Sequence, residues 1–346
     1  MKAMQDNIIK EIDHLIKDQM YYRDIPGLSI GIVLNHELKL QKGYGWADHA
    51  CNKEMSADAI FHMASISKLF TATAVMQFVE QRVLDLDEPF IRYLPDFKPE
   101  QPMVKEITLK QLLSHTSGMP DCDDYEWELA RDDEAALHEY VMSQTDISLL
   151  SRPGERFNYS NIAYEILGDI VSYQSGISFD DYCKQYILNP LEMKSSHFIM
   201  KLVDQQRLVS PHIKDGDNKI RVSPVFPYNR AHGPSSTLYS TVEELSRFAC
   251  SMMTLWQNKP SPVLKCSTFM TMMTPQAKIK EAEQIGLGWF ISQYDQQTFY
   301  GHEGNDIGFR TTFAMIPSKG LAIIVLANLQ TASTRKIMRG IYDIIS

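Results

Sequence analysis

The two ends of the chain carry the same kind of pattern, and this restricts the fold more than any other feature of the sequence. Near the N-terminus, residues 26–48 hold two apolar runs separated by Asn35-His36, which is typical of a β-hairpin. Near the C-terminus, residues 298–330 hold three strand-like runs, with turns expected at Glu303–Asp306 and Pro317–Gly320. Antiparallel strands from both ends are therefore expected to share one sheet.

Helices are expected to flank and interrupt these strands. Apolar residues recur at helical spacing within residues 8–16, which predicts an amphipathic N-terminal helix, and a last helix is expected over residues 334–345. From about residue 69 to 255 the pattern is mostly helical, although residues 201–235 look like a long irregular connection. The predicted fold class is α+β: an antiparallel sheet built from both chain ends and flanked by helices, with an inserted, mostly helical region.

The same patterns suggest a division of the chain. Residues 1–84 and 232–346 are expected to form the sheet domain with its terminal helices, and residues 85–231 the inserted helical region. An active site is expected between the two.

Composition argues against several classes of function. The net charge is −9 and no basic stripe is present, so nucleic acid is not expected as a partner, because an acidic surface repels phosphate. No apolar run approaches the roughly 20 residues that a membrane helix needs. The sequence contains no HExxH, no calcium-loop motif and no glycine-rich nucleotide loop, so no metal or cofactor is expected.

The five cysteines are scattered, odd in number and never in a CxxC pair. This argues against a disulfide framework or a zinc site and fits a reducing compartment. The first residues also lack the uninterrupted apolar core of a signal peptide. The expected location is cytoplasmic for the sequence as displayed, or periplasmic or secreted if a signal peptide was removed. The sequence does not predict an oligomeric state.

Two serine motifs compete for the role of nucleophile, which needs a neighbouring base because a serine hydroxyl is weak at neutral pH. The first is GxSxG around Ser29, residues 27–31. A nucleophile elbow requires a strand, a sharp turn and then a helix. Here the following residues continue as a strand, so Ser29 is predicted to lie inside a pleated segment, and the motif is interpreted as coincidental.

The second motif is SxxK, which occurs at Ser65–Lys68 and at Ser333–Lys336. Ser333 opens the terminal helix, where a capping role suffices. Ser65 precedes a helix that is apolar around most of its circumference and is therefore expected to be buried. Positions i and i+3 share a helix face, so the Lys68 amine can reach the Ser65 hydroxyl, and desolvation would make that amine a usable base.

Three further blocks, "ISKLFTATAVMQFVEQRVLDLDEPFIRYLP", "LLSHTSGMP" and "PGERFNYSNIAYEILG", resemble the serine β-lactamase and penicillin-binding protein superfamily. The resemblance is strongest to the class C-like branch, with D-aminopeptidases, D-alanyl-D-alanine carboxypeptidases and β-lactamase-like esterases. It runs from about residue 25 to 330. It implies a β-lactamase/transpeptidase-like fold with Ser65 as nucleophile and Lys68 as general base.

The resemblance also assigns the remaining site residues. Tyr159 of the Tyr159-Ser160-Asn161 motif would shuttle protons with the lysine, and Asn161 would bind the acyl side-chain amide of a substrate. His302 of His302-Glu303-Gly304 would take the place of the family's lysine, and Gly304 would let the substrate backbone approach closely. By analogy, the backbone N–H groups of Ser65 and Asn305 would form the oxyanion hole.

The third motif departs from the family pattern in its charge. A histidine is mostly neutral at pH 7, whereas lysine offers a permanent cation for a β-lactam carboxylate. Glu303 would add negative charge near that carboxylate. Both changes argue against strong β-lactamase activity.

These observations predict a serine hydrolase that acts through an acyl-enzyme on small amides, D-residue peptides or esters, with a small-molecule or peptide substrate as its partner. An esterase with little peptidase activity is one alternative. The other is an idle binding or scaffold protein that retains the fold, against which the complete set of Ser65, Lys68 and Tyr159 argues.

Overall fold

The computed structural model describes residues 5–346. Its helices are α1 (Asp6–Arg23), α2 (Ser67–Glu80), α3 (Leu109–Leu113), α4 (Ala136–Ser143), α5 (Asn161–Ser175), α6 (Phe179–Cys183), α7 (Val242–Trp256), α8 (Cys266–Met273) and α9 (Thr334–Ile345). Its strands are β1 (Gly27–Leu34), β2 (Glu37–Asp48), β3 (Lys53–Glu54), β4 (Phe61–His62), β5 (His212–Lys214), β6 (Ile220–Val222), β7 (Tyr239–Ser240), β8 (Ala277–Lys280), β9 (Glu283–Ile285), β10 (Phe290–Tyr294), β11 (Gln297–Asp306), β12 (Phe309–Ile316) and β13 (Leu321–Ala327).

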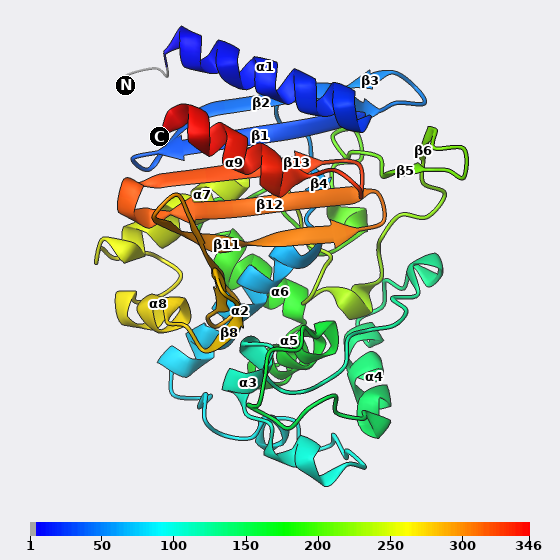
Figure 1. The fold of residues 1–346 in the computed structure, drawn as a ribbon. Helices are drawn as coiled ribbons and strands as arrows, with labels where there is room; N and C mark the ends of the chain where they lie inside the picture. The colour runs from blue at the N-terminus through cyan, green and yellow to red at the C-terminus, as the bar shows by residue number, and fades with distance from the viewer. Residues whose placement is uncertain (1–4) are drawn as a thin grey trace.

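A nine-stranded antiparallel sheet forms the upper layer of the molecule (Figure 1). Its strand order is β3-β2-β1-β13-β12-β11-β10-β9-β8, so the first and last strands of the chain, β1 and β13, are neighbours. The predicted α+β fold with a sheet built from both chain ends is confirmed. The division at residues 84 and 232 stays a prediction.

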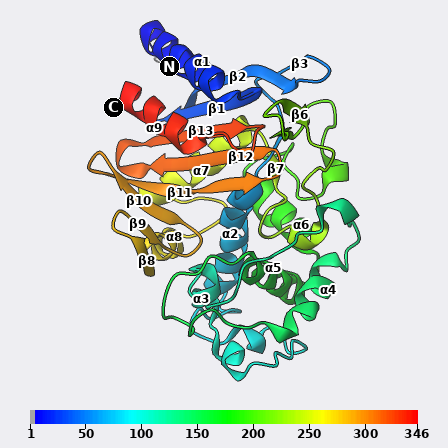
Figure 2. The same ribbon diagram turned by 45° about the vertical axis from the view of Figure 1, so that its right-hand side comes forward.

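The neighbouring strands β1 and β13 are buried on both faces, which explains their almost uninterrupted apolar sequences. In β13, Ile323 and Val325 pack in a core beneath α1 and α9, whereas Ile324 and Leu326 pack in a second core against the helices of the opposite face. Figures 1 and 2 show α1 and α9 together on one face of the sheet and α2, α7 and α8 on the other. The sheet is therefore sandwiched between two helical layers.

The hairpin between β1 and β2 turns at Asn35-His36, as predicted, with positive φ angles of 52° and 63° that suit a two-residue turn. The prediction of a turn at Glu303–Asp306 is wrong, because these residues belong to β11 and pair with β12. The chain turns instead at Ile307-Gly308, where Gly308 adopts a φ of +75°.

The GxSxG segment lies inside β1, as predicted, and no helix follows it. Ser29 is buried, and its hydroxyl has no hydrogen-bond partner among residues 5–346. Position 31 requires glycine because α7 packs closely against β1 there: a Cβ on residue 31 would lie 2.3 Å from Cγ1 of Val242. The motif thus has a packing role.

Residues 201–235 are mostly irregular, as predicted, apart from short 3-10 turns and the β5–β6 hairpin. The last part of this connection runs beside α2, where the Thr71 hydroxyl donates a 2.6 Å hydrogen bond to the Pro234 carbonyl. A chain segment with weak secondary structure therefore forms one wall around the start of α2.

No described helix is both long and apolar enough to cross a membrane. All five cysteines are free.

Candidate active site

Ser65 lies in a 3-10 turn, Ala64–Ile66, that leads directly into α2. Ser65 is partly exposed, whereas residues 67–78 of the following helix are all buried, as their apolar pattern predicted. Lys68 sits in the first turn of α2 and is completely buried. Its Nζ lies 3.2 Å from the Ser65 Oγ, so the two side chains meet as the spacing predicted.

The Lys68 amine has three hydrogen-bond acceptors around it: Ser65 Oγ, the Asn161 Oδ1 at 2.5 Å and the Ser235 carbonyl at 2.9 Å. Burial lowers the pKa of Lys68 from 10.5 to about 8, against the opposing effect of the Glu165, Asp121 and Asp306 carboxylates. About a tenth of the amine is therefore unprotonated at pH 7. Such an amine can accept a proton from Ser65.

Tyr159 lies just before α5 and hydrogen-bonds through its hydroxyl to the Ser65 side chain. Burial raises the pKa of Tyr159 well above 10, so the phenol stays protonated at neutral pH. Its ring stacks on His115, with the ring centroids 4.3 Å apart. His115 Nδ1 accepts a 3.1 Å hydrogen bond from the Ser160 N–H, which ties the loop after α3 to the start of α5. His115 thereby packs against the Tyr159 ring and also connects its own loop to the start of α5.

Asn161 is the first residue of α5, and its side-chain amide is fully engaged within the chain. Oδ1 accepts from Lys68, and Nδ2 donates to Asp121 Oδ1 at 2.7 Å and to the Tyr125 hydroxyl. The resemblance assigns Asn161 to a substrate amide. Here the side chain holds Lys68 in place, and a substrate would have to replace one of these bonds.

β11 supplies the opposite wall of the site with His302, Gly304 and Asn305. His302 Nδ1 donates to the Glu303 carbonyl at 2.7 Å, and Nε2 has no partner within the described part of the chain. Burial, helped by the nearby charge of Lys68, lowers the pKa of His302 from 6.5 to about 3. His302 is therefore neutral at physiological pH and supplies no cation to the site.

Glu303 lines the cavity, but the expectation that it adds an unpaired negative charge there is wrong. Successive residues of a strand point to opposite faces, so the Glu303 and His302 side chains point apart. Its carboxylate pairs with Arg310 at 3.0 Å and with Arg335 of α9. Glu303 is therefore neutralised by two guanidinium groups.

Gly304 brings β11 into close contact with the turn that carries Ser65. A Cβ at this position would lie 2.4 Å from the Met63 carbonyl oxygen and 2.8 Å from Cβ of Ala64. The Thr311 hydroxyl donates to the same Met63 carbonyl at 2.8 Å. The glycine therefore allows close packing within the chain, and its role in the approach of a substrate backbone stays a prediction.

All the predicted site residues except the completely buried Lys68 line one cavity of about 430 Å³. Ser65, Tyr159 and Asn161 line one side of it and His302 to Asp306 another, with aromatic surface from Phe290 and Phe299. Within residues 5–346 no group of His, Cys, Asp and Glu side chains could hold a metal ion.

Several residues of the site had no signal in the sequence. Asp121 and Tyr125 lie on the long loop between α3 and α4, and Ser235 lies in the irregular connection. Their atoms meet Lys68 and Asn161 from 36 to 167 positions away in the chain. Only the folded chain brings them together.

A family model described as Beta-lactamase matches residues 12–343. The chain belongs to the β-lactamase family. The match covers nearly the whole chain, which agrees with the resemblance seen in the motifs.

Relatives and solved structures of this β-lactamase family member carry several different names. "Protein flp" of Staphylococcus aureus (strain MW2) is 27% identical over 332 residues, which are 95% of this chain but 65% of that protein. The chain thus spans about two thirds of the length of such curated relatives. The octameric penicillin-binding protein homologue from Pyrococcus abyssi is 26% identical, with a TM-score of 0.84 over 98% of this chain and 77% of that one.

A D-amino acid amidase from Ochrobactrum anthropi SV3 shares the fold with a TM-score of 0.82. It is 21% identical, and the alignment covers 98% of this chain and 99% of that one. The similarity therefore extends over the complete sheet and the helical region.

Proposed function

We propose that this β-lactamase family member is a serine hydrolase that forms an acyl-enzyme on Ser65 with small amides, D-residue peptides or esters. The observation that carries the proposal is the buried Lys68 amine, 3.2 Å from the Ser65 Oγ and with its pKa lowered to about 8. Burial of a lysine amine costs folding stability, so a functional role would explain its presence here. Its position beside a partly exposed serine in a cavity is suited to proton transfer.

The reaction follows from the contacts around Ser65. Lys68 accepts the Ser65 proton as the hydroxyl attacks a carbonyl. The Tyr159 phenol then donates its proton to the leaving group as the bond between that group and the carbonyl carbon breaks, and Tyr159 regains a proton from the Lys68 ammonium. The backbone N–H groups of Ser65 and Asn305 stabilise the tetrahedral oxyanion. Water then releases the acyl group from Ser65.

The charges around the cavity favour substrates without a free carboxylate. His302 is neutral, and Arg310 and Arg335 are engaged by Glu303. Asp121 adds an exposed carboxylate at the cavity wall. The amidase named above is a fold relative, which supports small amides as substrates, while the neutral His302 supports the esterase alternative.

An active-site fluorophosphonate probe tests the proposal. The wild-type protein is expected to gain the mass of one adduct, and Ser65→Ala none, because the activated hydroxyl is missing. Ser29→Ala is the matched control: Ser29 is buried without a hydrogen-bond partner, so its loss should leave labelling and stability unchanged. Intact-mass spectrometry reads all three proteins. An unlabelled wild type would favour the idle scaffold, and labelling of Ser65→Ala would place the nucleophile elsewhere.

The preference for uncharged substrates is a second prediction. We expect kcat/KM for a nitrophenyl ester or a D-amino-acid anilide to exceed that for a peptide ending in a free D-alanine carboxylate by at least about tenfold, since His302 is neutral and Arg310 and Arg335 are already paired with Glu303. Steady-state kinetics on the three substrates give the ratios. A ratio of ester to anilide far above one would favour the esterase, and the reverse the amidase. A preference for the carboxylate peptide would contradict the prediction.

A further inference from the structure

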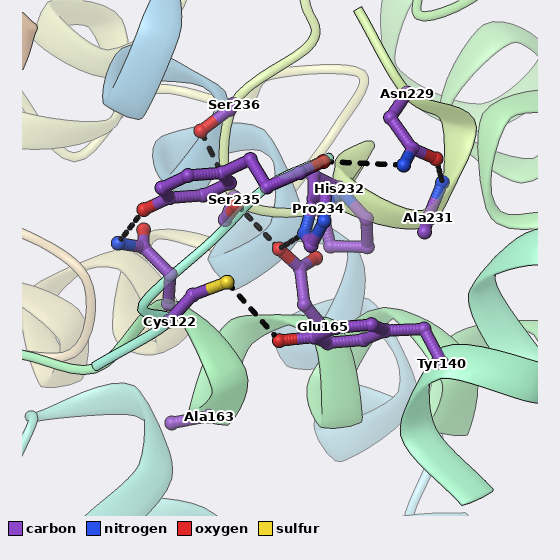
Figure 3. A network of polar contacts seen from close by, with 12 residues as sticks. Cys122, Tyr140, Ala163, Glu165, Asn229, Ala231, His232, Pro234, Ser235 and Ser236 are labelled. Atoms are coloured by element: carbon purple, nitrogen blue, oxygen red, sulfur yellow. Dashed lines mark hydrogen bonds and ion pairs between the residues drawn. The ribbon is translucent and has the colours of Figure 1, made fainter. Parts of the chain in front are cut away.

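A buried carboxylate–histidine pair lies behind Lys68. Glu165 sits on α5, one turn after Asn161, and is completely buried. Its Oε1 accepts a hydrogen bond of 2.5 Å from the Ser235 hydroxyl and contacts His232 Nδ1 at 3.1 Å. Figure 3 shows this group between α5 and the segment that carries His232 and Ser235. A carboxylate removed from water is costly, so its position calls for an explanation.

Ser235 connects this pair to the reactive centre. Its side chain is bonded to Glu165, and its backbone carbonyl accepts the 2.9 Å hydrogen bond from Lys68 Nζ. The preceding residue, Pro234, is held against α2 by Thr71. Glu165 therefore fixes, through one intervening residue, an acceptor that orients the amine.

His232 connects the pair to the cavity wall. Its ring meets the edges or faces of Tyr125 and Tyr140, with centroids 4.9 and 4.7 Å away and interplanar angles above 70°. The Tyr125 hydroxyl in turn accepts a hydrogen bond from the Asn161 side-chain amide, and Tyr125 lines the cavity. The pair therefore contacts two residues that neighbour the Lys68 site: Ser235, whose carbonyl accepts from Lys68, and Tyr125, which is hydrogen-bonded to Asn161.

We propose that Glu165 and His232 form a buried positioning pair for the base: Glu165 holds the Ser235 carbonyl against Lys68, and His232 holds Glu165. The inference rests on the proposed function, because the orientation of Lys68 matters to a reaction at Ser65. Neither residue touches the reacting atoms.

An electrostatic consequence follows from the geometry. Glu165 is foremost among the carboxylates that raise the pKa of Lys68 against the effect of burial, ahead of Asp121 and Asp306. Four further titratable groups near the amine carry no charge at neutral pH, because burial lowers the pKa of two histidines and raises that of two tyrosines: His115, His302, Tyr159 and Tyr164. Removing the Glu165 charge should therefore shift the Lys68 titration to lower pH.

Glu165→Gln tests this, because glutamine keeps the shape and an acceptor oxygen but removes the charge. In protein labelled with ¹³C-lysine, the Lys68 signal, assigned by its absence from Lys68→Met, is expected to titrate about one pH unit lower than in wild type. The pH midpoint of fluorophosphonate labelling should move in the same direction. Asp169→Asn is the matched control: Asp169 is also buried on α5 and pairs with a histidine, His138, at 3.0 Å. It should leave the Lys68 midpoint unchanged.

A Lys68 midpoint that moves no more in Glu165→Gln than in Asp169→Asn overturns the proposal. If Glu165→Gln does not fold, Ser235→Ala replaces it, since that variant keeps the carbonyl and loses the hydroxyl link to Glu165. A lower Lys68 midpoint in Ser235→Ala then supports the proposal, and an unchanged one overturns it. The NMR titration does not require an active enzyme. If the Lys68 midpoint shifts as expected but the fluorophosphonate labels no protein, the proposed function is refuted and the contact between Glu165 and the Lys68 site is still supported.

Discussion

Lys68→Met is expected to slow acylation of Ser65 by about 10³- to 10⁴-fold at pH 8. Lys68 is the amine beside the Ser65 hydroxyl, and Tyr159 cannot replace it as base because its phenol stays protonated. Methionine is unbranched and one atom shorter than lysine, so it fills most of the buried space without a charge. The measurement is the second-order rate constant of fluorophosphonate labelling, followed by intact-mass spectrometry from pH 6 to 10.

The pH dependence of labelling should identify the base. The unprotonated amine accepts the proton, so the wild-type rate should rise with pH and level off above the Lys68 pKa of about 8. Below that pH the rate should fall about tenfold per unit, whereas the Lys68→Met profile should be flat across the range. Lys336→Met, in the second SxxK motif and exposed on α9, is the matched control and should keep the wild-type profile. A Lys68→Met rate within tenfold of wild type would exclude Lys68 as the base.

The same pKa shift affects stability. The Lys68 pKa lies near 8 in the folded protein and at 10.5 for an unperturbed lysine, so the unfolded chain binds more protons between these values. Stability contributed by this group should therefore rise with pH from about 8 to 10.5. Below pH 8 the buried ammonium costs about 3 kcal/mol of folding stability.

Much of the fold was predictable because it depends on local patterns. The all-round apolar helix after Ser65 and the apolar strands at both chain ends predict the buried α2 and the shared sheet. The failure at Glu303–Asp306 has a physical cause: Gly304 and its polar neighbours resemble a turn, but pairing with β12 extends β11 through them. Tertiary pairing overrode the local turn preference.

The candidate site was predictable where its parts are close in sequence. Ser65 and Lys68 meet because one helical turn separates them. Glu165 and Ser235, by contrast, are 70 positions apart, and neither carries a local pattern. Arg310 of β12 and Arg335 of α9 are likewise not recognisable from the sequence as partners of Glu303, so the sequence predicted an unpaired charge where the structure has ion pairs.

Gly304→Ala is expected to be destabilising and nearly inactive. The new Cβ would lie 2.3 Å from Thr311 Oγ1 and 2.4 Å from the Met63 carbonyl oxygen. That carbonyl belongs to the backbone just before the Ser65 turn, so relief of the clash must move either β11 or the turn. Overpacking of this kind costs about 1–3 kcal/mol. Urea denaturation should show that loss as a lower midpoint with an unchanged slope.

The effect on labelling should be larger than the effect on stability. Any separation of β11 from the turn would displace the Asn305 N–H, the proposed oxyanion donor, relative to Ser65, and loss of one such donor costs about 10²- to 10³-fold in rate. Gly216→Ala is the matched control, because no atom lies within 4 Å of a Cβ there, and it should match wild type in both measurements. If folded Gly304→Ala kept the wild-type labelling rate, the close approach of β11 would serve packing alone, and the oxyanion role proposed for Asn305 would have to be abandoned.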